Sequence, residues 1–244
     1  GSRRTPPRAP FLVPQGYIVE FQARGNLVIH GGDATGVLYG TYAVLEAVGV
    51  RFCHPGAEGV VLPSSEPAVG IPLPLAGRPR FPIRIVYAEQ RLAETAEDEF
   101  TFLARLRINR VRTAHPYSPG LVREAARRGI RIEVGGHEIN ALLPRDQFAR
   151  KPECFRCTTS GVRGRRSNDF NACAASAETQ RIMERNAERY VRARPGAATY
   201  HFWPADIGGG GWCSCPLCKH LTVSDQSVLA ANAAARAVRR AEPG

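Results

Sequence analysis

The N-terminal part of the chain concentrates apolar residues in two short stretches and then changes to a helical spacing. Residues 17–22 and 26–30 are rich in β-branched and aromatic side chains, and the three residues between them include a glycine, so a β-hairpin is predicted. Apolar positions then recur three and four residues apart over 37–48, which predicts a helix capped by Thr35. With a short strand over 50–53, the pattern gives a β-β-α-β module.

A proline-rich stretch follows over 63–82. Neither a helix nor a central strand is compatible with its prolines, so it is predicted to be a linker. Beyond it the pattern alternates between strands and helices, which is typical of parallel βαβ units. The predicted strands are 83–87, 110–114, 130–134 and 199–204, and the predicted helices are 98–106, 119–128, 178–192 and 224–240.

This alternation predicts an α/β fold in which a small N-terminal α/β accessory domain precedes the first half, about four β/α units, of a TIM-type (β/α)8 barrel. The expected domains are an irregular lead-in at 1–15, the accessory domain at 16–62, the linker at 63–82 and the partial barrel at 83–244. The chain is therefore expected to be an N-terminal fragment. Its open barrel edges would expose unpaired strands and favour oligomers or other association.

Composition and charge narrow the class of protein. The chain has 244 residues, 43% hydrophobic and 23% charged, as expected for a soluble protein with a core. It contains no apolar run of about 18 residues, so no membrane insertion is expected, and its N-terminus lacks the apolar segment of a signal peptide. The net charge of +11 comes from scattered arginines, with lysine only at Lys151 and Lys219. Because no basic motif is interleaved with aromatic residues, nucleic-acid binding is not expected.

Several short motifs carry a family resemblance. Gly16-Tyr-Ile-Val-Glu-Phe21, followed by the segment Asp33–Glu46, resembles the accessory α/β domain of bacterial β-hexosaminidases and α-glucuronidases. Further motifs, in their order along the chain, resemble the bacterial family called domain of unknown function 4838. They are Gly136-His-Glu-Ile-Asn140, Lys151-Pro-Glu-Cys-Phe155, Asn171-Ala-Cys173, Pro204-Ala-Asp206 and Cys213-x-Cys-x-x-Cys218.

The resemblance implies a glycoside-hydrolase-like barrel behind a small accessory domain. In its full-length form such a protein would hydrolyse O-glycosyl bonds in a polysaccharide or glycan substrate. The family analogy also favours an extracellular or periplasmic location. A fragment that ends after about four β/α units would lack part of the active site and would be inactive.

Two acidic residues stand where predicted strands end. His137 and Glu138 follow the strand over 130–134, and Asp206 follows the strand over 199–204, so all three belong to the rim where a barrel gathers its functional groups. Glycosidases use two carboxylates that flank the scissile bond. Asp206 is the first candidate catalytic residue and Glu138 the second, although Asp206 could instead cap the glycine-rich turn that follows it.

Three further residues are candidates for substrate binding. His137 and Asn140 could contact sugar hydroxyls or bond only to the backbone, since loop residues after a strand take both roles. Trp212 is favoured over Trp203 for stacking on a sugar ring, because a tryptophan inside a strand is more often a core residue.

The seven cysteines leave several alternatives open. Cys213, Cys215 and Cys218 have a spacing that suits a structural zinc ion, and His220 or the Cys154–Cys157 pair could contribute further ligands. However, the segment between the two C-x-x-C pairs is much longer than the roughly 12–20 residues of common zinc modules. A disulfide or free buried thiols are the alternatives. No catalytic metal ligand and no required cofactor are expected.

The sequence therefore supports one leading hypothesis and two others. The first is a glycoside-hydrolase-like protein with a carbohydrate substrate. The second is a non-catalytic carbohydrate-binding or scaffold protein on the same architecture. The third is a zinc-organised nucleic-acid binder, suggested by the positive charge and the cysteine pairs.

Overall fold

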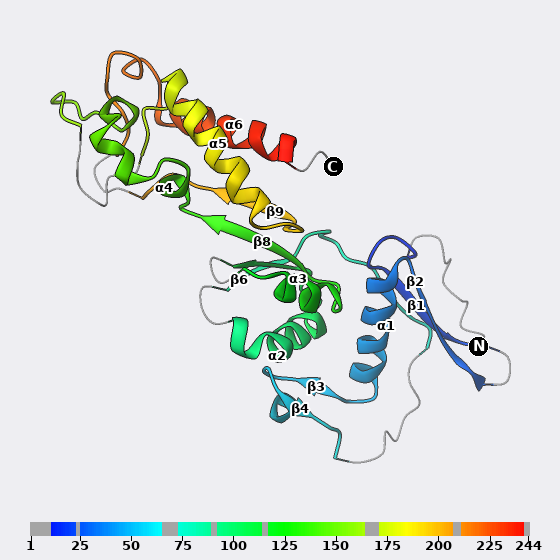
Figure 1. Ribbon diagram of the computed structural model, residues 1–244. Coiled ribbons are helices and arrows are strands. Elements are labelled where there is room, and N and C mark those ends of the chain that lie inside the picture. The colour runs from blue at the N-terminus through cyan, green and yellow to red at the C-terminus, as the bar shows by residue number, and fades with distance from the viewer. Residues whose placement is uncertain are drawn as a thin grey trace. The chain divides into compact units, whose positions relative to one another are not determined.

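Figure 1 shows a computed structural model of the chain. The structure describes residues 11–22, 25–64, 73–88, 92–113, 117–163, 171–206 and 211–241. Contacts between residues divide the chain into two compact units, Gly1–Ile132 and Glu133–Gly244.

The first unit contains the predicted hairpin and helix. Strand β1 (Tyr17–Phe21) pairs antiparallel with β2 (Leu27–Gly31), and helix α1 (Ala34–Ala47) follows directly. The helix begins one residue before the predicted cap, because Asp33 accepts a hydrogen bond from the backbone N–H of Gly36 at 2.7 Å. Asp33, not Thr35, is therefore the N-cap.

The proline-rich stretch differs from the prediction in one respect. Within it, β5 (Leu75–Gly77) pairs antiparallel with β1, so the sheet order is β2-β1-β5. Because β5 is an edge strand, prolines can flank it without interrupting the sheet. Strands β3 (Arg51–Phe52) and β4 (Val60–Val61) form a separate antiparallel pair.

Parallel strands alternate with helices in the rest of the chain, as predicted. The strands are β6 (Ile85–Ala88), β7 (Arg110–Thr113), β8 (Arg131–Gly136) and β9 (Thr199–Phe202). The main helices are α2 (Leu92–Arg105), α3 (Pro119–Ala126), α5 (Ala177–Arg192) and α6 (Val223–Ala241). The strand order is β6-β7-β8-β9, and the pairs β6–β7 and β8–β9 are parallel. The mixed α/β class is confirmed, and the described strands do not close a barrel.

The loop-rich segment after β8 contains short helical turns. They are α4 (Ile139–Leu142) and two 3-10 turns at Arg145–Ala149 and Pro152–Cys154. These turns pack with α5 and α6 around a core that includes Phe155, Met183 and Ala233. Small alanines on α6 let it approach α5 closely.

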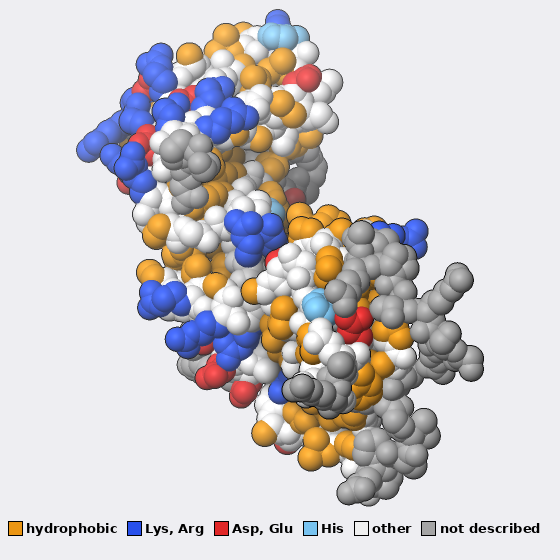
Figure 2. Space-filling model, turned by 90° about the vertical axis from the view of Figure 1, so that its right-hand side faces the viewer, with side chains coloured by type: hydrophobic (Ala, Val, Ile, Leu, Met, Phe, Trp, Pro, Cys, Tyr) orange, Lys and Arg blue, Asp and Glu red, His pale blue; other side chains and the backbone are white. Residues whose placement is uncertain are grey.

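Figure 2 shows Lys and Arg side chains gathered on one side of the unit that contains α5 and α6, with acidic side chains among them. Many of these charges form ion pairs. The pairs include Arg181–Glu178, Arg192–Glu188, Arg236–Glu184 and Arg240–Glu184. Part of the positive charge is thus balanced locally. Among the described residues, no helix has the length and apolar character required to cross a bilayer.

Candidate functional site

Alternation along β9 places two side chains on the face of the strand away from the helices. The ring of Phe202 lies 5.2 Å from that of Tyr190 on α5, so Phe202 points into the core of the second unit. Successive side chains of a strand point to opposite faces, and His201 and Trp203 therefore share the other face. Glu133 of β8 lies on this face too, because its Oε2 is 2.8 Å from His201 Nε2.

The backbone conformation of β8 leaves no room for a side chain at one position opposite β9. Gly135 is opposite His201 in the register and has a φ of +100°. A Cβ atom at this position would lie 2.2 Å from the carbonyl oxygen of His201. Beyond it, the N–H of Trp203 donates to the Gly136 carbonyl at 2.6 Å. A glycine at position 135 therefore allows the two strands to stay paired up to their carboxyl ends.

Two of the predicted site residues meet at these strand ends. His137 Nε2 lies 3.3 Å from Asp206 Oδ2, and His137 Nδ1 donates to the Pro204 carbonyl oxygen at 2.6 Å. The indole plane of Trp203 is nearly perpendicular to the rings of both histidines, with ring centroids 5.4 Å from His137 and 5.5 Å from His201. The side chains of His137 and Asp206 are 48% and 89% exposed, so both can reach a ligand.

The contacts of His137 orient its ring. A carbonyl oxygen only accepts hydrogen bonds, so Nδ1 is the nitrogen that donates to Pro204. This leaves Nε2 to face the Asp206 carboxyl group at 3.3 Å. Imidazole and carboxyl groups are the side chains most often used for proton transfer, and this pair is placed where a ligand could reach it.

The other predicted residues lie elsewhere. Glu138 is half-buried just before α4, and the described His137–Asp206 contact does not include its carboxylate. The side chain of Asn140 lies outside the described residues. Trp212 lines a cavity of about 730 Å³ together with Arg156 and Lys219. The lining of this cavity includes none of His137, Glu138 and Asp206, so Trp203, not Trp212, is the tryptophan beside His137.

A buried asparagine holds the segment that carries Asp206. Asn171 is 2% exposed, and its Oδ1 accepts from the N–H of Ala205 at 3.0 Å. Its Nδ2 donates to the carbonyl oxygen of Gly211 at 2.7 Å. Asn171 thus fixes both the residue before Asp206 and the residue that precedes Trp212.

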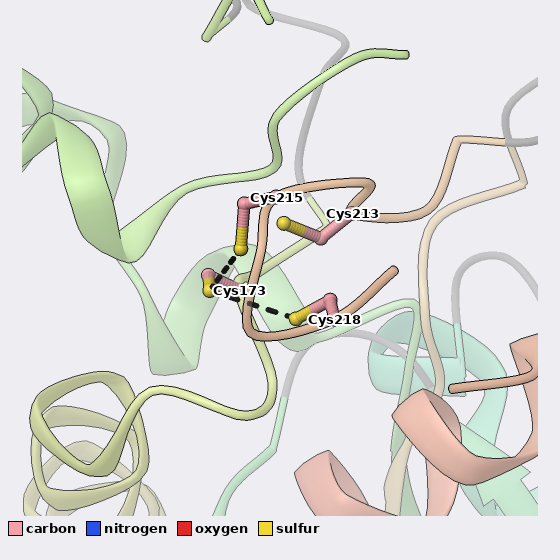
Figure 3. A group of neighbouring side chains, drawn as sticks. All are labelled: Cys173, Cys213, Cys215 and Cys218. Carbon is pink, nitrogen blue, oxygen red and sulfur yellow. Dashed lines mark hydrogen bonds between the residues drawn. The ribbon is translucent and has the colours of Figure 1, made fainter. Parts of the chain in front are cut away.

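Four buried cysteines form a second group in the same unit. Figure 3 shows the side chains of Cys173, Cys213, Cys215 and Cys218 pointing toward one another. Their sulfur atoms all lie within 4.8 Å of one another, and Cys173 Sγ is 3.5 Å from Cys215 Sγ and 3.7 Å from Cys218 Sγ.

The four cysteines of this group differ from the zinc ligands expected from the sequence. The fourth thiol is Cys173, and neither His220 nor the Cys154–Cys157 pair contributes to the cluster found among the described residues. Cys154 is buried in the apolar core instead, while Cys157 packs beside the cluster. The sequence signal for Cys173 was weak, because it is a lone cysteine far along the chain from its partners.

Hydrogen bonds within the cluster distribute the protons unevenly. A side-chain hydrogen bond from Cys173 lowers the pKa of Cys213 to about 4, and the backbone N–H of Cys157 also donates to this sulfur at 3.3 Å. Burial raises the pKa of Cys218 to about 11. Four sulfur atoms in this arrangement could hold a metal ion.

No protein-family model and no curated protein matches this chain. The fold is similar to that of a β-N-acetylhexosaminidase, with a TM-score of 0.51 and 15% identity over 92% of this chain and 57% of that chain. A family GH115 4-O-methyl-α-glucuronidase with specificity for decorated arabinogalactans gives a TM-score of 0.54 and 15% identity over 94% of this chain and 32% of that chain. An inactive mutant of a GH20 exo-β-N-acetylglucosaminidase from Vibrio harveyi gives 0.53 and 13% identity over 93% of this chain and 43% of that chain.

These likenesses define the class of fold. At 13–15% identity they show a glycoside-hydrolase-like α/β architecture of partial TIM type. This chain spans 57% or less of the length of each of the three structures.

Proposed function

We propose that this chain is a glycoside-hydrolase-like protein that binds carbohydrate at the carboxyl ends of β8 and β9. The observation that carries this proposal is the contact of His137 with Asp206 beside the ring of Trp203. In parallel α/β folds, ligands bind at the carboxyl ends of the strands, and the fold resembles that of glycosidases. A similar fold does not by itself indicate a binding site. The argument for a site here is that His137, Asp206 and Trp203 lie together at the strand ends.

Each residue has a proposed role. Asp206, whose carboxyl group lies 3.3 Å from His137 Nε2, is the candidate general acid toward the glycosidic oxygen, and Glu138 is the second candidate carboxylate. Trp203 offers a stacking surface for a sugar ring, since its side chain is partly exposed. Asn140 and Trp212 remain candidates for contacts at neighbouring sugar units.

The finer classification is also a proposal. The ordered motifs support membership of the family called domain of unknown function 4838, with an accessory domain at 16–62 and a partial barrel at 83–244. Polysaccharide or glycan substrates and an extracellular or periplasmic location follow from the same analogy.

Carbohydrate binding tests this function directly. Probes are N-acetyl-β-glucosaminide oligosaccharides and glucuronic-acid-bearing arabinogalactan fragments, chosen from the activities of the structural neighbours. Calorimetry on the 244-residue chain should show binding to one of these classes. Asp206→Asn and Trp203→Ala should each weaken it about tenfold, equivalent to about 1.4 kcal/mol. Asp146→Asn changes an exposed acidic residue of the 3-10 turn Arg145–Ala149, which is not part of the described His137–Asp206 contact, and is the matched control.

The outcomes separate the hypotheses. Turnover of aryl glycosides that Asp206→Asn abolishes would establish a hydrolase, and binding without turnover would favour the non-catalytic alternative. Failure to bind either carbohydrate class would overturn the proposal. Salt-dependent binding to nucleic acid in its place would favour the zinc-organised nucleic-acid binder.

A further inference from the structure

The four-cysteine cluster has the dimensions of a zinc tetrathiolate. Zinc–sulfur bonds are about 2.3 Å long, so neighbouring sulfurs of a tetrahedral site lie about 3.8 Å apart. The separations of Cys173 from Cys215 and Cys218, 3.5 and 3.7 Å, are close to this value. From this geometry we infer that Cys173, Cys213, Cys215 and Cys218 bind one structural zinc ion.

A disulfide explains the cluster less well. Bonded sulfur atoms are about 2.05 Å apart, much closer than any separation measured here. One disulfide would use only two of the four thiols, and two disulfides would need two separations of about 2.05 Å, whereas Cys173 Sγ lies 3.5 and 3.7 Å from its neighbours. Zinc uses all four sulfurs, and thiolates are its preferred ligands in closed structural sites.

The surroundings hold the sulfur atoms in place. Gln226 of α6 is 3% exposed, and its amide accepts from the N–H of Cys213 and donates to the carbonyl of Cys213, both at 3.0 Å. The N–H of Ser214 donates to the Cys157 carbonyl at 2.7 Å. The Arg163 side chain, which donates to the Phe155 carbonyl, lies within electrostatic range of the cluster. Such a guanidinium offsets the negative charge of a tetrathiolate site, and partners of this kind orient metal ligands.

The ion would also fasten the segment that carries Asp206. Cys173 lies two residues after Asn171, and Cys213 lies two residues after Gly211. Asn171 already bridges Gly211 and Ala205 by hydrogen bonds of 2.7 and 3.0 Å. Zinc would join the chain two residues from Asn171 and two residues from Gly211. Asn171 is therefore a positioning residue for Asp206, and the ion holds Asn171.

Metal content of the intact chain tests the inference. Protein purified under reducing conditions, without chelator, should contain one zinc ion per chain by mass spectrometry. Replacement by Co²⁺ should give the intense visible absorption of tetrahedral thiolate coordination. Cys173→Ser and Cys215→Ser should lose both signals. Cys157→Ser, which removes a buried thiol beside the cluster, and Cys53→Ser, which removes an exposed one, should keep them.

The metal content of the wild-type protein decides whether the cluster binds zinc, and this measurement does not depend on any variant folding. Wild-type protein that takes up neither zinc nor cobalt would overturn the inference, as would a disulfide within the cluster or full zinc content in Cys173→Ser.

The positioning role of Asn171 has its own test. Zinc removal should speed amide hydrogen exchange at 203–206 and leave exchange in β1 unchanged. Unchanged exchange at 203–206 would refute that role. No carbohydrate is used in these measurements, so their failure is distinct from failure of the proposed function.

Discussion

At the scale of single residues, Gly135 shows how a backbone constraint supports the candidate site. We expect Gly135→Ala to destabilise the second unit, because a φ of +100° strains any side chain and the new Cβ would meet the His201 carbonyl oxygen at 2.2 Å. Strain of this kind costs about 1–3 kcal/mol before the clash is added. Urea unfolding followed by tryptophan fluorescence measures the loss.

A second glycine provides the control for this substitution. Gly161 also has a positive φ, of +81°, but a Cβ there would have no heavy atom within 4 Å. Gly161→Ala should therefore show the cost of backbone strain alone. Equal losses for the two variants would mean that the close approach of β8 to β9 does not matter for stability.

The residues of the candidate site differ in how well the local sequence predicts them. His137 and Asp206 could be found because each follows a recognisable strand, and parallel strands end at the same edge. Glu133 and His201 were missed because both lie inside strands, where a polar residue has no local signal until its partner is known. Cys173 was missed for a different reason: it is a lone cysteine, and only the fold brings it to Cys215.

At the scale of elements, periodicity predicted most helices and strands to within a few residues. Helices α5 and α6 and strands β8 and β9 all lie close to their predicted ranges. Strand β5 could not be predicted, because a three-residue edge strand among prolines owes its existence to pairing with β1. Such pairing is a tertiary contact that no local pattern records.

The contact between α5 and α6 should depend on pH through Glu184. Its carboxylate bonds to Arg236 at 2.5 Å and to Arg240 at 3.1 Å. Burial raises the pKa of Glu184, but the hydrogen bonds from both arginines outweigh this and hold it below the usual 4.5. The stabilisation is therefore fully present above about pH 4.5 and is lost as the pH falls through the lowered pKa.

Comparison with a glutamine variant measures this contribution. Glu184→Gln should be less stable than the wild type at pH 7, by about 1 kcal/mol or less because the pair is partly solvated. The difference should shrink as the pH is lowered to about 3. Glu188→Gln, whose carboxylate pairs with Arg192 of the same helix, is the control and should not affect the contact between helices. A stability gap for Glu184→Gln that stays constant with pH would contradict the assignment.

At the scale of the whole molecule, the alternation of strands and helices predicted parallel pairing, and the parallel pairs β6–β7 and β8–β9 confirm it. Whether the sheet closes into a barrel is a different property, because it depends on the twist and stagger of many strands together. A local sequence pattern does not contain the twist and stagger. The division into the units Gly1–Ile132 and Glu133–Gly244 likewise comes from contacts across the fold.

These two units allow a final test of what zinc stabilises. The chain has two tryptophans, Trp203 and Trp212, and both lie in the second unit, so tryptophan fluorescence reports on that unit alone. A ligand that binds the folded state stabilises it by mass action, and all four cysteines of the cluster are in the second unit. Chelation should therefore lower the unfolding midpoint seen by fluorescence. The part of the far-ultraviolet circular dichroism signal that comes from the first unit should keep its midpoint, and a common shift of both signals would show that zinc stabilises the chain as a single cooperative unit.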